Sequence, residues 1–121
     1  MKYQKTSGNG IKLVAVVPEE EGSIPFIRKC VENGVRVTLA HHNGSPGEIK
    51  RAVDAGAPVS NHLGNGCANM IHRHNNPLWP QLAEERLTPS IIADGCHLTD
   101  EEGEMLLHKT IVAGEVVYSK D

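Results

Sequence analysis

The strongest constraint on the fold is an alternation of short apolar runs with segments that carry helix signals. Ile11 to Val17 is almost wholly apolar and β-branched, and it ends at Pro18. Such a run is typical of a strand that is buried on both faces, as in a parallel sheet. Val35 to Ala40 repeats the pattern, so the sequence predicts a second strand of the same kind.

Each of these runs is followed by a predicted helix. The first helix is expected between Ser23, a possible N-cap, and Gly34, a stop signal. The second begins after Ser45, with Glu48 as the carboxylate of a capping box, and ends near Gly56. The resulting order is strand, helix, strand, helix.

The rest of the chain continues this order and then departs from it. Pro58 to His62 and Ser90 to Ala93 are predicted strands on either side of a long polar connection, and Thr99 with Glu102 gives a third capping signal. The tail from Thr110 to Lys120 predicts two short strands around a turn. The alternation favours a parallel α/β sheet, either an open doubly wound sheet or part of a barrel.

Composition limits the functions that a chain of 121 residues can have. The net charge of −3 and the scattered basic residues argue against nucleic acid as a partner. No apolar stretch is long enough to span a membrane, and the first ten residues are too polar for a signal peptide. Cys30, Cys67 and Cys96 are odd in number and lack CxxC spacing, which indicates reduced thiols and a cytoplasmic protein.

Histidines follow three consecutive predicted strands. His41 and His42 come after the second strand, His62 closes the third, and His97 follows the fourth. The carboxyl ends of parallel strands converge on one face, where imidazoles could hold zinc or a similar divalent ion. A histidine at a strand end is also often a hydrogen-bonded structural group, and Arg73 could be a surface charge or a phosphate clamp.

Three segments of the chain resemble, in the same order, segments of N-acetylglucosamine-6-phosphate deacetylases. They are Ala40-His41-His42-Asn43-Gly44-Ser45, Asn61-His62-Leu63-Gly64-Asn65-Gly66 and Ile91-Ile92-Ala93-Asp94-Gly95-Cys96-His97. Val16-Val17-Pro18-Glu19 is similar to the Ala-Pro-Glu of that family. The resemblance runs from about Ile11 to Thr99.

The resemblance implies an amidohydrolase (β/α) barrel and removal of acetyl from N-acetylglucosamine 6-phosphate, which leaves glucosamine 6-phosphate and acetate. It implies that the metal, which we expect to be zinc, is held by His41 and His62. It also implies that the amino-sugar phosphate is contacted by Asn65, Gly66, Arg73 and His97.

Two functional residues of the family have no matching position. The metal-binding glutamate of the family belongs to a strand before the matched region, and Met1 to Gly10 offers no equivalent. The catalytic aspartate of the family belongs to a Thr-Asp or Ser-Asp motif, and no such motif follows Thr99. We therefore assign no catalytic residue. A metal or sugar-phosphate binding module without turnover is the alternative, and another amidohydrolase is a third possibility that replacement of Arg73 would test.

The predicted organisation is a partial (β/α) domain over residues 1–109 and a short β tail over residues 110–121. About four parallel strands make roughly half of a complete barrel. Half a barrel leaves an apolar face and strand edges uncovered, so we expect the chain to form a homo-oligomer.

Overall fold

A computed structural model describes residues 2–92, 94, 96–97, 109–112 and 115–119. Its contacts divide the chain into two compact units, residues 1–90 and residues 91–121, and each unit is described by itself. The domain boundary predicted after residue 109 falls inside the second unit and stays a prediction.

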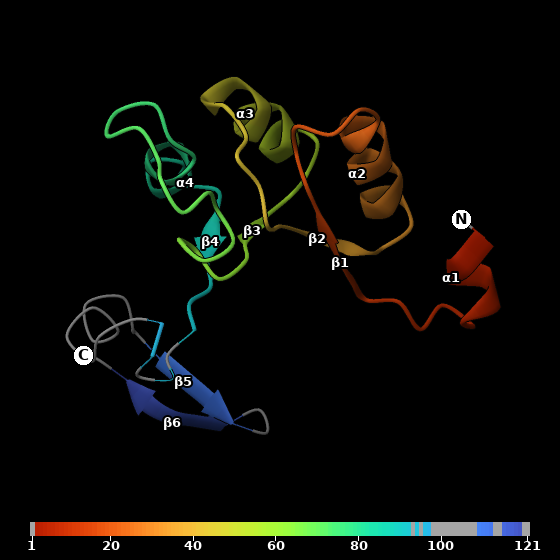
Figure 1. Cartoon of the computed structure of the whole chain (residues 1–121). Helices are drawn as coiled ribbons and strands as arrows, with labels where there is room; N and C mark the ends of the chain where they lie inside the picture. The colour runs from red at the N-terminus through yellow and green to blue at the C-terminus, as the bar shows by residue number, and fades with distance from the viewer. Residues whose placement is uncertain (1, 93, 95, 98–108, 113–114, 120–121) are drawn as a thin grey trace. The chain divides into compact units, whose positions relative to one another are not determined.

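The first unit contains a four-stranded parallel sheet (Figure 1). Its strands are β1 (Leu13–Val16), β2 (Arg36–Leu39), β3 (Val59–Ser60) and β4 (Thr88–Pro89). Their order in the sheet is the order in the chain. A doubly wound sheet reverses its strand order at a switch point, so this unbroken order favours the barrel type of fold over the open sheet.

Two helices follow the first two strands, as predicted. Helices α2 (Ser23–Glu32), α3 (Pro46–Asp54) and α4 (Leu78–Leu82) lie along one side of the sheet, and α1 (Lys2–Thr6) precedes β1 (Figure 1). The sequence predicted neither α1 nor α4.

The two predicted helix starts differ in outcome. The capping box of α3 is confirmed, because the Ser45 hydroxyl accepts the Glu48 N–H while the Glu48 carboxylate accepts the Ser45 N–H. The predicted N-cap of α2 is wrong. Gly22 caps α2 with a left-handed backbone, and Ser23 is already helical, with its hydroxyl donating to the Pro18 carbonyl at 2.8 Å.

The core lies between the helices and one face of the sheet. Val37 and Leu39 of β2 are fully buried, as are Ile27 and Cys30 from α2 and Ile49 from α3. Cys30 is therefore a small buried hydrophobic residue, and burial raises the pKa of its thiol.

The fourth strand lies earlier in the chain than predicted. The sequence predicted a strand over Ser90–Ala93, whereas β4 is Thr88–Pro89. The position is fixed by β3, because the Pro58 carbonyl accepts the Thr88 N–H and the Ser60 carbonyl accepts the Ser90 N–H. Hydrogen bonding to the neighbouring strand thus outweighed the β propensity of the two isoleucines that follow.

The second unit contains the predicted β tail. Strands β5 (Lys109–Val112) and β6 (Glu115–Ser119) pair antiparallel, which confirms the two short strands. The capping signal at Thr99 and Glu102 lies outside the described residues. Within the residues that the structure describes, no helix has the length and apolar character needed to cross a bilayer.

A core substitution tests the packing of α3 against the sheet. Ile49 is 1 % exposed, and we expect Ile49→Ala to lower the free energy of unfolding by about 2–5 kcal/mol, since it removes buried methyl groups and leaves a cavity. Val31→Ala is the control, because Val31 is 43 % exposed on α2. Urea denaturation of both variants measures the difference, and equal losses would contradict the core described above.

The loop between α4 and β4 is tied to α3 by charged groups. The Arg86 guanidinium donates to Glu84 at 2.7 Å and to Asp54 at 2.9 Å, and Asp54 also accepts from Lys50 at 3.0 Å. The hydrogen bonds from Arg86 lower the pKa of Glu84 from 4.5 to about 2.

This cluster predicts a pH dependence. Because Glu84 has a lower pKa in the folded chain than in the unfolded chain, its ion pair stabilises the fold above pH 4.5, and this is lost as the pH falls toward 2. We expect Glu84→Gln to flatten the pH dependence of unfolding across that window. Denaturant titrations at several pH values measure it, with the exposed Glu85→Gln as the control. An unchanged slope in Glu84→Gln would show that the ion pair does not stabilise the fold.

Candidate functional site

The ends of β2 and β3 bring the two predicted metal ligands together. His41 follows β2 by two residues and His62 follows β3 by two residues. Their ring centroids are 4.7 Å apart, and the rings meet edge to face at 81°. His41 is exposed and His62 is half-buried, so solvent can reach the pair.

Both histidines have a left-handed backbone. The φ angle is 51° at His41 and 34° at His62, a region that costs a residue with a side chain roughly 1–3 kcal/mol. Neighbouring hydrogen bonds hold His62 there, because its N–H donates to the Ser90 hydroxyl at 2.8 Å and the next N–H, of Leu63, donates to the Ser90 carbonyl at 2.8 Å. The sheet thus determines where the His62 ring stands.

A hydrogen bond also determines which nitrogen of His62 is free. Its Nδ1 lies 2.8 Å from the Asn65 carbonyl oxygen, which can only accept, so Nδ1 carries the proton. The lone pair is then on Nε2, which is available to a ligand. Metal-binding histidines are commonly oriented in this way by a carbonyl on the other ring nitrogen.

The predicted substrate residues Asn65 and Gly66 lie in the same turn. Gly66 has a φ of 85°, and a Cβ built on it would stand 3.2 Å from Cγ of His41, so the backbone approaches the ring closely. A small cavity of about 10 Å³, roughly the space of one water molecule, adjoins His41. Its lining includes His41, Asn65, Cys67 and Gln81.

The spacing of the two rings is near that of two imidazoles on one divalent ion. Two imidazoles that bind one tetrahedral zinc, each at about 2.0–2.1 Å, have centroids roughly 5.2 Å apart, and the observed 4.7 Å is slightly shorter. Within the described ranges, no group of three or more His, Cys, Asp or Glu side chains is arranged to hold a metal. The described residues thus bring two imidazoles together, whereas a catalytic zinc site usually has three protein ligands.

A second layer of polar groups supports the loop after β2. One Glu19 carboxylate oxygen accepts the Asn43 N–H at 2.7 Å, and the other is buried without a hydrogen-bond partner among the described residues. His42 is 7 % exposed, and its Nδ1 accepts the Gly44 N–H at 3.2 Å. Burial lowers the pKa of His42, while a hydrogen bond with Gln81 and the charge of Glu19 oppose that shift.

These contacts give Glu19 and His42 a structural role. A Cβ added to Gly44, in the same loop, would lie 3.1 Å from Pro18 and 3.3 Å from Glu19. The loop after β2 therefore packs closely against the residues that follow β1. The sequence did not predict that Glu19 joins them. Its resemblance to the Pro-Glu of the related deacetylases was the signal that could have identified it.

Arg73 and His97 are not brought to the imidazole pair by any described contact. Arg73 is exposed, and its carbonyl accepts the indole N–H of Trp79 at 2.7 Å. His97 belongs to the second unit, where its Nδ1 lies 2.8 Å from the Asp94 carboxylate. Backbone hydrogen bonds from His97 and Cys96 lower the pKa of Asp94 to about 2. The predicted convergence of His97 with the other histidines stays a prediction.

Replacing Glu19 tests whether it holds the loop that carries His41. We expect Glu19→Ala to lower the free energy of unfolding by about 1–3 kcal/mol, since the Asn43 N–H loses its acceptor. Glu19→Gln keeps an acceptor oxygen and should lose clearly less. Urea denaturation gives the stabilities, and amide hydrogen exchange at Asn43 reports the bond directly. Equal exchange in Glu19→Ala and the unmodified chain would contradict this role.

Comparison with known proteins agrees with the fold. No family model matches the chain. It is 34 % identical over 92 residues to an N-acetylgalactosamine-6-phosphate deacetylase of Escherichia coli O157:H7, a match that covers 76 % of this chain and 24 % of the relative. It is 29 % identical over 96 residues to the N-acetylglucosamine-6-phosphate deacetylase of Bacillus subtilis (strain 168), covering 79 % of this chain and 24 % of the relative.

Solved structures give the same result. N-acetyl-D-glucosamine-6-phosphate deacetylase from Mycobacterium smegmatis matches 87 % of this chain with a TM-score of 0.76 and 25 % identity, and the match spans 28 % of that structure. The enzyme from Pasteurella multocida matches 99 % of this chain with a TM-score of 0.72 at 18 % identity, spanning 37 % of that structure, which supports the fold alone. The chain spans about a quarter of the length of the curated relatives that it matches. Its curated homologues and its structural neighbours are amino-sugar-phosphate deacetylases of the amidohydrolase barrel type, and the recognition made from the sequence is confirmed to that extent.

Proposed function

We propose that this chain carries metal and substrate contacts of a metal-dependent hydrolase that removes acetyl from N-acetylglucosamine 6-phosphate, giving glucosamine 6-phosphate and acetate. The observation that carries the proposal is the pairing of His41 with His62 at neighbouring strand ends, with ring centroids 4.7 Å apart. The sequence similarity to deacetylases over 76 % of the chain supports the reaction class.

In this proposal the imidazoles of His41 and His62 hold a divalent ion, most simply zinc. His62 would bind through Nε2, because its Nδ1 proton is engaged by the Asn65 carbonyl. When bound, such an ion polarises an amide carbonyl and lowers the pKa of a coordinated water. The left-handed backbone and the Ser90 contacts keep the His62 ring in place before any ligand arrives.

The substrate contacts follow from the same turn and from two further residues. The backbone of Asn65 and Gly66 is close enough to the imidazole pair to contact a group bound there. Arg73 and His97 are proposed to bind the phosphate or hydroxyl groups of the sugar. Since relatives of both sugar types match the chain, N-acetylgalactosamine 6-phosphate is a second substrate to assay.

A binding module without turnover is the alternative function. It is favoured by the metal ligands themselves, because the described residues offer two imidazoles and no third ligand. A general acid or base contributes roughly 10²- to 10⁴-fold to such a hydrolysis, and no residue of this chain is assigned that role. Turnover would then require groups from outside the described residues. Location in the cytoplasm stays a prediction.

The experiment combines zinc titration with an acetate-release assay on both sugar phosphates. We expect His62→Ala to weaken zinc binding by at least about tenfold, since it removes one of two ligands. His74→Ala is the matched control, because His74 is exposed in the loop after the site. Both variants are checked for folding by circular dichroism.

The outcomes separate the two functions. Acetate release that is lost in His62→Ala and kept in His74→Ala supports the hydrolase. Zinc binding that depends on His62, without acetate release from either substrate, supports the binding module. Zinc binding that is equal in the unmodified chain and His62→Ala would overturn the metal site and, with it, both functions.

A further inference from the structure

Gln81 is a buried glutamine on α4 whose amide group has a hydrogen-bond partner at both ends. It is 7 % exposed, and its Nε2 donates to the Pro77 carbonyl at 2.7 Å. Because a carbonyl can only accept, this bond fixes the orientation of the amide and leaves Oε1 on the opposite side. There Oε1 accepts the hydroxyl of Ser60, which is 1 % exposed. The neighbours of Gln81 thus hold its side chain in one orientation.

Gln81 also contacts the residue that follows His41. Nδ1 of His42 accepts the Gly44 N–H, so the proton of the neutral ring is on Nε2, which is a donor. His42 forms a side-chain hydrogen bond with Gln81, and both side chains line the same small cavity. An amide oxygen can accept two hydrogen bonds, so Oε1 of Gln81 serves both His42 and Ser60. One acceptor on α4 is therefore shared by the loop after β2 and the end of β3.

The two partners of Gln81 are close in the chain to the two predicted metal ligands. His42 directly follows His41, and Ser60 precedes His62 by two residues. Gln81 and His41 also line the same cavity of about 10 Å³. A single side chain of α4 thus reaches both of the strand ends that carry a ring.

The backbone of the imidazole pair makes such support necessary. His41 and His62 have left-handed φ angles of 51° and 34°, and such angles persist only where surrounding contacts hold them. The Ser90 hydroxyl holds His62 through its N–H. On the other side of the pair, the backbone after His41 leads into the ring of His42, which is buried and bonded to Gln81. Gln81 therefore restrains the loop that carries the more exposed of the two rings.

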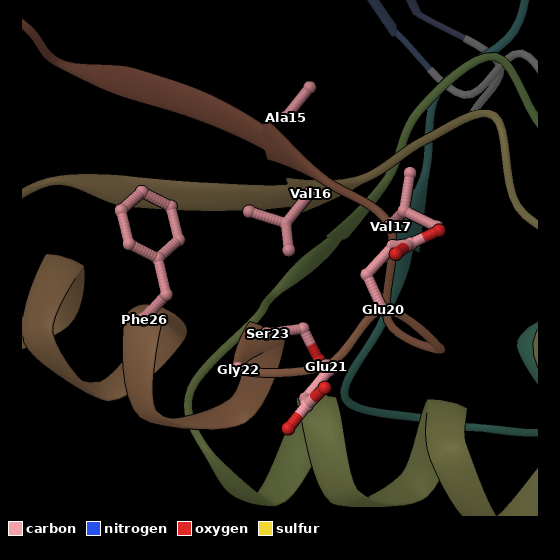
Figure 2. A pocket seen from close by; sticks show the side chains of 8 residues that line it. All are labelled: Ala15, Val16, Val17, Glu20, Glu21, Gly22, Ser23 and Phe26. Atoms are coloured by element: carbon pink, nitrogen blue, oxygen red, sulfur yellow. The ribbon is translucent and has the colours of Figure 1, made fainter.

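The end of β1 is built differently from the ends of β2 and β3. Figure 2 shows a hollow of about 330 Å³ at this place, lined by apolar side chains such as Val17 and Phe26 and by the acidic side chains of Glu20 and Glu21. The residues that line it belong to β1, to the loop after it and to α2. Gln81 instead lies beside β2 and β3, where the histidines are.

We propose that Gln81 is a positioning residue for the imidazole pair. Its amide oxygen holds the loop after β2 and the end of β3 together, and this keeps the rings of His41 and His62 edge to face with centroids 4.7 Å apart. In this role Gln81 acts through His42 and Ser60 and not on the ion itself. The value of this role for metal binding rests on the proposed function, whereas the placement of the rings is measured without metal.

Gln81→Leu in the full-length chain tests the proposal. Leucine fills most of the space of glutamine and has no polar atom, so His42 and Ser60 lose their shared acceptor. In the zinc-free chain we expect loss of the nuclear Overhauser effect between the ring protons of His41 and His62. In zinc titrations we expect the dissociation constant to rise by about 10- to 100-fold, as is typical when a group that orients a metal ligand is removed.

Gln4→Leu is the matched control. Gln4 is also a glutamine that is 7 % exposed, and its side chain makes two hydrogen bonds to the backbone of Ile11, before β1. Its replacement removes buried hydrogen bonds of the same kind at a place that does not contact the histidines. Gln4→Leu should therefore lower the free energy of unfolding, measured by urea denaturation, and leave the ring contact and the zinc dissociation constant unchanged.

Ser60→Ala is the second variant, and it decides the question if Gln81→Leu does not fold. It removes only the hydroxyl that Oε1 of Gln81 accepts. Ser60→Ala should weaken the ring contact and zinc binding in the same direction as Gln81→Leu. Where both variants fold, the double variant should bind zinc little more weakly than Gln81→Leu, since both changes break the same hydrogen bond.

A ring contact that is lost in Gln81→Leu and kept in Gln4→Leu supports the proposal. A ring contact that survives in both Gln81→Leu and Ser60→Ala would overturn it. Equal changes in the two glutamine variants would also overturn it, because the general loss of stability would then explain them. If the unmodified chain shows the ring contact and binds no zinc, the proposed metal site fails, and the ring contact alone decides the role of Gln81. Absence of the ring contact from the unmodified chain would contradict the role directly.

Discussion

The structure depends on the parallel pairing of β2 with its two neighbours. Val37 and Leu39 of this strand are completely buried, and the helices pack against the face that they form. The same register aligns the ends of the strands, with Val16 beside Leu39 and Leu39 beside Ser60. Residues that follow these strands therefore emerge at one edge of the sheet. The positions of the two imidazoles thus depend on the pairing of the strands as well as on the loops that follow them.

Hydrogen bonds within and between the loops then fix the residues that follow the strands. The turn after β3 folds back so that the Asn65 carbonyl meets the His62 ring, and the loop after β2 is held by Glu19 from the end of β1. Three consecutive strand ends thus cooperate, although only two of them contribute an exposed or half-buried imidazole. His42 differs from its neighbour His41, because it is buried and its ring accepts a hydrogen bond from the backbone.

Much of this arrangement was predictable from the sequence, because buried parallel strands and capped helices have strong local patterns. β1, β2 and α3 were predicted for that reason, and the strand ends predicted that His41 and His62 would be neighbours. α4 was missed because it has five residues, contains Pro80 and has no side-chain cap. The position of β4 and the contact between Glu19 and Asn43 depend on partners distant in the chain, which no local pattern contains.

The left-handed backbone at His41 and His62 has a consequence for how such a sequence changes with time. Glycine or asparagine relieves this conformation, and histidine is only one of several tolerated residue types. A change to glycine at either position would therefore relax the backbone and remove a ring. At these two positions, which hold rings 4.7 Å apart, the stability of the backbone and the presence of the imidazole pair oppose each other.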